Sequence, residues 1–78
     1  MQGEYQYLSF EFFSTTGKTN LYRVYSKVGT VLCLGIIKWY GPWRRYVFYP
    51  AQDTIFDAGC LRDVCGFIDH LMFARKAK

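Results

Sequence analysis

Two strand-like runs joined by a Gly-Pro pair constrain the fold of this chain most. The first run, VLCLGIIKWY (31–40), is apolar at both odd and even positions until Lys38, which is typical of a strand covered on both faces. The second run, WRRYVFYP (43–50), returns as another strand and ends at Pro50, because proline has no N–H to donate to a sheet ladder. These residues predict an antiparallel β-hairpin.

Two further strands precede this hairpin. The segments YQYLSFEFF (5–13) and LYRVYS (21–26) alternate between polar and apolar or aromatic residues, which is the pattern of a half-buried strand. The run STTGKTN (14–20) consists of turn formers, and KVGT (27–30) carries the glycine that a hairpin turn needs. The chain therefore predicts four antiparallel strands in a meander.

A single amphipathic helix follows the strands, from about residue 58 to about residue 74. Asp57 is a suitable N-cap, because its carboxylate can accept a backbone N–H of the first helical turn. Cations at the C-terminal end of the helix complement the helix dipole. We expect an α+β, two-layer fold in one domain, 1–78, with the helix packed on one sheet face. The predicted apolar stripe consists of Leu61, Val64, Cys65, Ile68, Leu71 and Met72, and the terminal cations are Arg75, Lys76 and Lys78.

The composition indicates the cellular environment in which we expect the protein. The 78 residues include three cysteines, an odd number with no disulfide framework, which favours a reduced cytoplasmic environment. The N-terminal segment MQGEYQY lacks the features of a signal peptide, and no run approaches eighteen apolar residues, so we expect no membrane segment.

Catalytic chemistry has little support in the sequence. His70 is the one histidine and lies on the predicted polar side of the helix. Asp63 precedes it by seven residues, about 10 Å along a helix axis, so the helix itself sets up no dyad. The Gly-Lys-Thr at 17–19 lacks the earlier glycine of a phosphate-binding loop, and no residues have metal-ligand spacing. We therefore predict no enzyme activity, cofactor or metal.

Aromatic and basic residues alternate through the predicted hairpin and indicate a binding surface. Six cations and no acid lie between Phe12 and Gln52. A block of one charge favours an anionic partner, although it also serves solubility. Because one helix covers one sheet face, the other face must be polar, dimerised or a binding surface, and both faces carry rings. The candidate partner-binding residues are Lys38, Trp39, Tyr40, Trp43, Arg44, Arg45 and Tyr46.

Two partner classes fit these residues. Protein interfaces are enriched in Trp, Tyr and Arg, so we expect first a protein partner, either a second copy in a homodimer or a host protein. The alternative is a sequence-tolerant single-stranded nucleic acid, whose bases stack on rings between cations. Convergence of Lys38, Trp43, Arg44 and Arg45 on one open surface would favour nucleic acid. Buried rings with diverging cations would favour a protein partner or a purely structural role.

The C-terminal half resembles a group of small uncharacterised bacterial and phage-borne proteins. They carry the motif K-W, then W-R-x-Y-x-F-x-P, then F-[DN]-x-x-C-L. The resemblance implies no particular activity. It implies a phage or mobile-element context, in which a small non-enzymatic effector acts on a host protein complex. The matching positions are Lys38, Trp39, Trp43, Arg44, Tyr46, Phe48, Pro50, Phe56, Asp57, Cys60 and Leu61.

Overall fold

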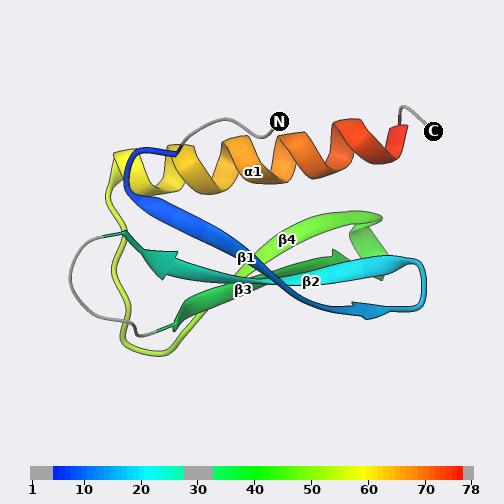
Figure 1. Ribbon diagram of the computed structural model, residues 1–78, viewed down its shortest axis with the longest axis horizontal. Helices are drawn as coiled ribbons and strands as arrows, with labels where there is room; N and C mark the ends of the chain where they lie inside the picture. The colour runs from blue at the N-terminus through cyan, green and yellow to red at the C-terminus, as the bar shows by residue number, and fades with distance from the viewer. Residues whose placement is uncertain (1–4, 28–32, 77–78) are drawn as a thin grey trace.

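A four-stranded antiparallel sheet followed by one helix forms the protein (Figure 1). The computed structural model describes residues 5–27 and 33–76. The strands lie side by side in chain order, and α1 lies across one face of the twisted sheet, so the predicted α+β meander with a C-terminal helix is confirmed. The elements are β1 (Leu8–Thr16), β2 (Thr19–Ser26), β3 (Cys33–Tyr40), the 3₁₀ turn η1 (Gly41–Trp43), β4 (Arg45–Pro50) and α1 (Ala58–Lys76).

The first hairpin is longer than the sequence predicted. We expected β1 over 5–13, but it runs to Thr16, and the presumed turn residues 14–16 pair with the start of β2. Threonine is β-branched and fits a pleated sheet, so only Gly17, at φ 61°, and Lys18 are left to turn the chain. The expected turn at 27–30 and the first two residues of the expected strand 31–40 lie outside the described residues, as does Lys78.

The helix faces the sheet with a different stripe from the predicted one. Leu61 is half exposed and Cys65 is exposed, so their assignment to the buried stripe was wrong. Phe67, which the predicted stripe omitted, is buried and stacks on Phe10 with 4.3 Å between ring centroids and 4° between ring planes. This stacking places the buried side of α1 on Val64, Phe67, Ile68, Leu71 and Met72, with Cys60 at its start.

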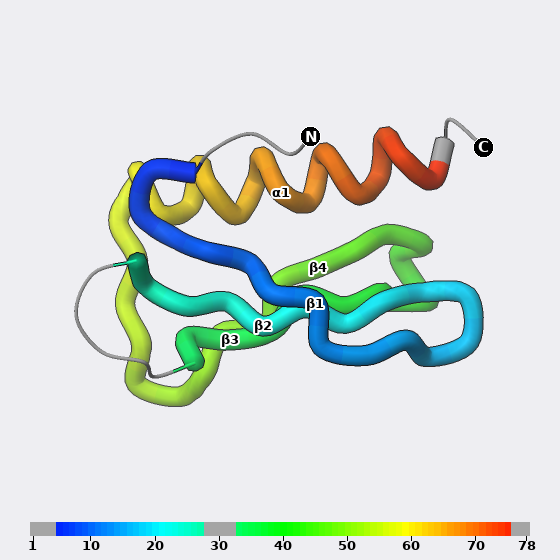
Figure 2. Tube along the Cα trace, in the orientation of Figure 1, coloured from blue at the N-terminus to red at the C-terminus, as the bar shows by residue number. Residues whose placement is uncertain are grey.

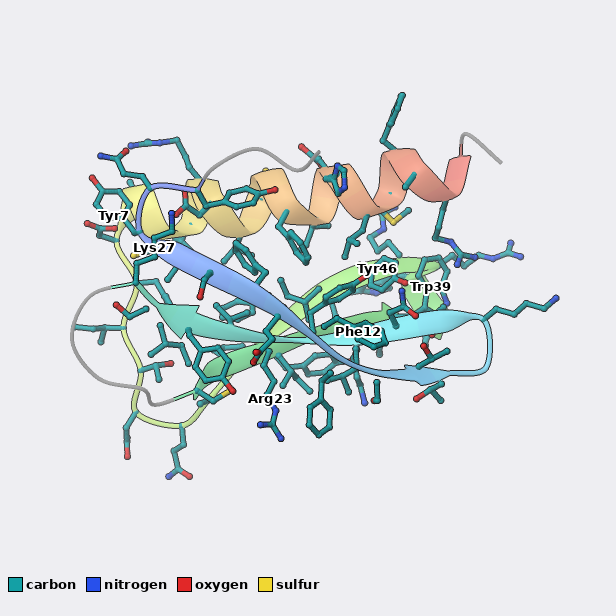
Figure 3. All side chains as sticks on the ribbon, viewed as in Figure 1. Tyr7, Phe12, Arg23, Lys27, Trp39 and Tyr46 are labelled. Carbon is teal, nitrogen blue, oxygen red and sulfur yellow. The ribbon has the colours of Figure 1, made fainter. Side chains whose placement is uncertain are left out.

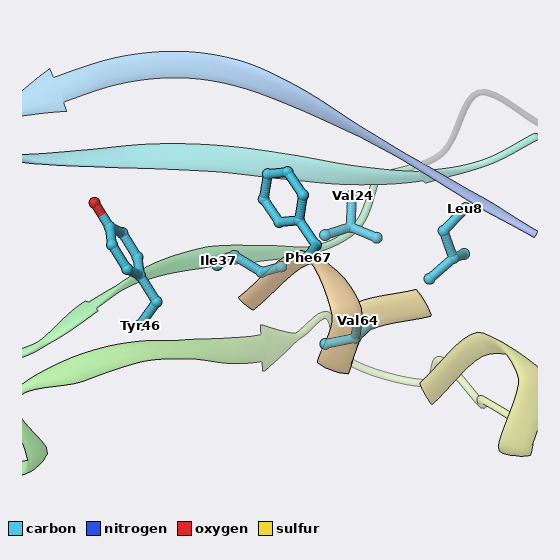
Figure 4. Close-up of a cluster of buried hydrophobic side chains, with 6 residues drawn as sticks. All are labelled: Leu8, Val24, Ile37, Tyr46, Val64 and Phe67. Carbon is cyan, nitrogen blue, oxygen red and sulfur yellow. The ribbon is translucent and has the colours of Figure 1, made fainter. Parts of the chain in front are cut away.

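The core lies between α1 and the sheet (Figure 4). Tyr22 and Tyr5 meet the Phe67 ring edge-on at centroid distances of 5.0 and 6.0 Å. Edge-on and stacked aromatic pairs add to the apolar burial that holds a small domain together. The buried hydrophobic side chains are Leu8, Val24, Ile37, Tyr46, Val64 and Phe67.

A register shift between β2 and β3 changes the cross-strand partner of Cys33. The register shifts between Val24 and Tyr25, so that Cys33 pairs with Tyr25 while Gly35 pairs with Val24. Simple alternation would place Cys33 on the face of Ile37, but such a shift inserts a residue and breaks that alternation.

Candidate functional site

The face of the sheet opposite α1 carries the aromatic-basic residues that the helix does not cover. Figure 3 shows Arg23 pointing away from α1, whereas Trp39 and Tyr46 lie on the helix side. We call this surface the open face. Its side chains with charge or rings are Glu11, Phe13, Arg23, Tyr25, Lys38, Tyr40, Arg45 and Tyr49, and Trp43 borders it at the β4 edge.

The strand register places the cations of the open face. Arg23 of β2 pairs with Ile36 of β3, which in turn pairs with Tyr49 of β4. At the end of the second hairpin, Tyr40 pairs with Arg45. Directly opposed side chains on one face lie about 5 Å apart, so these residues form a continuous surface across three strands.

Two cations of the open face lie over aromatic rings. The Arg23 guanidinium carbon is 3.8 Å from the centroid of the Phe13 ring, and Lys38 Nζ is 5.3 Å from that of Tyr49. Arg23 Nη1 also donates to the Tyr25 hydroxyl at 3.4 Å. That hydrogen bond raises the pKa of Arg23 above its ordinary value. Like every arginine, Arg23 keeps its positive charge. The rings therefore position these charges on the open face, where Glu11 lies directly opposite Arg23 and offsets part of its charge.

The second hairpin presents the most exposed indole. Trp43 is 64% exposed, and its ring meets the Tyr40 ring edge-on with 5.1 Å between centroids. Arg44 closes the turn in the left-handed region, at φ 57° and ψ 48°, and its N–H donates to the Tyr40 carbonyl at 2.9 Å. This closure directs the chain into β4 and leaves Trp43 at the sheet edge.

The structure separates the seven predicted binding residues into four places. Lys38, Tyr40 and Arg45 lie on the open face. Trp43 stands at the β4 edge, where its ring meets Tyr40 of that face and also lines a hollow that reaches Ile68 of α1. Tyr46 is buried beneath α1. Trp39 is half buried on the same side, where its ring meets the Tyr46 ring edge-on at 5.4 Å. The Arg44 side chain is exposed at the turn.

Sequence reasoning missed the part of the open face that lies nearer β1. Arg23 and Tyr25 alternate with Tyr22 and Val24 in a recognisable strand, so parity could have grouped the first two. Phe13 could not have been placed in this way. It occupies the register shift between Phe12 and Ser14, and such a shift depends on the pairing of two strands.

Charge on the described strands is nearly of one sign. Arg23, Lys38 and Arg45 are their cations and Glu11 is their one acid. The other described acids belong to the connection before α1 or to α1 itself. The open face therefore attracts anions more than cations.

Asp63 and His70, the two residues considered for catalysis, lie in different environments. The Asp63 carboxylate accepts the backbone N–H groups of Tyr7 and Leu8 at 2.7 and 3.1 Å, while His70 is exposed. Among residues 5–27 and 33–76, no group of three or more His, Cys, Asp or Glu could hold a metal ion. In the same ranges, no helix has the length and apolar character needed to cross a membrane.

Comparison with known proteins identifies relatedness to a phage protein. No family model matches the chain, and no solved structure matches it. An "Uncharacterized 9.3 kDa protein" of Acholeplasma phage L2 is 39% identical over 72 residues, which cover 91% of each chain. Identity at this level over nearly the whole length shows common descent. The chain therefore belongs to the family of this phage protein.

Proposed function

We propose that the open face binds single-stranded nucleic acid without catalysing a reaction. The observation that carries this proposal is the convergence of Lys38, Arg45 and Arg23 on one uncovered surface, with exposed Trp43 at its edge. The alternative pattern applies in part: the rings of Trp39 and Tyr46 are half buried or buried on the helix side, and Arg44 lies apart at the turn. A phage or mobile-element setting is part of the proposal and draws support from the phage relative.

The proposed interaction has two components. Each base that stacks on a ring such as Trp43 contributes about 1–3 kcal/mol with little sequence preference, because every base has a π-face. Lys38 and Arg45 on the same surface would contact phosphates and release counterions. A duplex hides its base faces, so a surface of rings selects a single strand.

Fluorescence anisotropy with labelled single-stranded DNA and RNA, at two salt concentrations, tests the proposal. We expect binding that weakens steeply with salt, because each neutralised phosphate of a single strand contributes about 0.7 to the slope of log K against log salt. Trp43→Ala removes a stacking ring and should weaken binding by about 5- to 150-fold. Lys38→Ala should weaken binding and lower the salt slope.

Two variants of α1 provide matched controls. Arg62→Ala removes an exposed cation from the helix, and Phe73→Ala removes a ring that is 72% exposed there. Neither residue belongs to the open face, so both variants should bind like the parent protein. Equal losses from Lys38→Ala and Arg62→Ala would show that net charge alone drives binding, and an absence of binding would refute the proposal.

A protein partner is the second candidate function, and a hollow at the β4 edge favours it. The hollow has a volume of about 320 Å³ and is lined by Tyr40, Trp43, Val47, Phe48 and Tyr49. In the described sheet β4 is an edge strand, whose backbone can pair with a second copy or with a host protein. Light scattering tests self-association. A dimer mass that Val47→Lys converts to a monomer mass would support a homodimer through this edge.

A further inference from the structure

A groove lies between α1 and the sheet. It is at the end of the molecule that holds both the β1–β2 turn and the last turns of the helix, which the chain trace in Figure 2 shows. The groove has a volume of about 470 Å³, within the range of small-molecule sites. The side chains that matter for its chemistry are Lys18, Asn20, Tyr22, Tyr46 and Arg75. This groove is separate from the open face, because its sheet residues lie on the helix side.

Asn20 holds both tyrosine hydroxyls in one arrangement. Its backbone N–H donates to the Tyr46 hydroxyl oxygen at 3.1 Å, and its side-chain Nδ2 donates to the Tyr22 hydroxyl oxygen at 3.1 Å. Thr15 Oγ1 donates to Asn20 Oδ1 at 3.0 Å, which fixes the orientation of the amide. Each phenol oxygen is therefore an acceptor of a hydrogen bond.

The two phenol protons are left available as donors. A tyrosine hydroxyl has one proton to give, and among residues 5–27 and 33–76 neither Tyr22 nor Tyr46 gives it to an acceptor. Most of Tyr46 is buried, which fixes its ring, while the residue also lines the groove. Each hydroxyl therefore has one proton to offer to a ligand in the groove that both residues line.

The charge of the groove matches an anionic partner. Lys18 and Arg75 line it, and its lining includes no carboxylate. The Arg75 guanidinium carbon lies 4.2 Å from the centroid of the Trp39 ring, which holds the cation at the groove. The end of α1 carries a partial negative charge of about half an elementary charge, which two full positive charges exceed.

We propose that this groove binds a phosphate group. The oxygens of a phosphate can accept hydrogen bonds from the two tyrosine hydroxyls, the Lys18 ammonium and the Arg75 guanidinium. The two cations also balance the negative charge of the phosphate. The phosphate could belong to a small ester, such as a mononucleotide, or to the backbone of a nucleic acid. The inference does not depend on the proposed function, since the donors come from the opposite side of the sheet.

The Asn20 resonances in ¹H–¹⁵N NMR spectra test the inference. The protein is titrated in separate experiments with inorganic phosphate, a 5′-mononucleotide and a short single-stranded oligonucleotide, with sodium chloride holding ionic strength constant. We expect saturable shifts of the Asn20 backbone and side-chain amides, since both donate to the phenols that would bind the ligand. The ligand that acts at the lowest concentration identifies the source of the phosphate.

Isosteric variants separate a built site from general charge attraction. Tyr22→Phe removes one O–H donor and keeps the ring, so phosphate binding should weaken roughly tenfold. Tyr40→Phe makes the same chemical change on the open face and should have no effect on the Asn20 titration. Unchanged Asn20 resonances with all three ligands would overturn the inference, as would equal affinities in the Tyr22 and Tyr40 variants.

Discussion

The carboxylate of Asp63 joins the helix to the start of the sheet, and its removal should destabilise the protein severely. The side chain is 9% exposed, and Oδ2 accepts two backbone N–H groups, from Tyr7 at 2.7 Å and Leu8 at 3.1 Å. Leu8 is itself 1% exposed, so its N–H cannot gain water when the carboxylate is lost. These two hydrogen bonds connect residues more than fifty positions apart in the chain.

The size of the effect follows from these contacts. A hydrogen bond to a charged group contributes about 1.5–3 kcal/mol, and a buried donor left unsatisfied costs about 1–3 kcal/mol. Because both donors share one oxygen, the effects overlap, and we expect Asp63→Ala to lower the free energy of unfolding by about 3 kcal/mol. Asp63→Asn keeps an acceptor oxygen and should cost about 1 kcal/mol. The total for a domain of this size is only about 4–12 kcal/mol.

Urea denaturation followed by circular dichroism measures these losses. With an m-value of about 1 kcal/mol per molar, Asp63→Ala should lower the midpoint by about 3 M. Asp69→Ala is the matched control, because it removes an exposed aspartate from the same helix. The pKa of Tyr5, which burial and the Asp63 charge both raise, should also fall in Asp63→Asn. If Asp63→Ala and Asp69→Ala lose equal stability, the proposed connection is wrong.

Three further predictions concern the backbone and the helix cap. A Cβ on Gly35, at φ 157°, would lie 2.6 Å from a backbone oxygen of β4. Gly35→Ala should therefore lower the free energy of unfolding by at least about 2 kcal/mol. Gly41→Ala is the control, because open space surrounds that position, and it should leave the urea midpoint nearly unchanged. Arg44→Gly should raise the free energy of unfolding by about 0.5–1 kcal/mol, because glycine adopts the left-handed region without strain; a lower midpoint would contradict this. Backbone hydrogen bonds at the start of α1 lower the pKa of Asp57, so its contribution to stability is present above the unfolded-state pKa and is lost as pH falls through the folded-state pKa. Asp57→Asn keeps the cap and does not titrate, so its melting temperature should fall less between about pH 5 and pH 3 than that of the parent; parallel curves would refute the assignment.

Local patterns in the sequence predicted the order and kind of the elements. Alternating residues marked the first two strands, and two apolar or aromatic runs around a Gly-Pro pair marked the other two. A period near 3.6 marked one helix, because such patterns follow from backbone geometry within a few residues. The N-cap was equally local: Asp57 Oδ1 accepts the Cys60 N–H at 2.9 Å, as expected. Lys38 and Tyr40 share a face because they lie two residues apart in one strand.

Contacts between distant residues decided the rest. The rotation of α1 depends on Phe67 stacking on Phe10 and on Asp63 reaching the backbone of β1, and no local period contains either contact. The shift that moves Cys33 to the partner position of Tyr25 arises only when two strands pair. Alternation within a strand is set by its own backbone, whereas register and helix rotation are set by the partner surface. The sequence alone therefore determined the elements and their order, and the tertiary structure decided which side chains each surface presents.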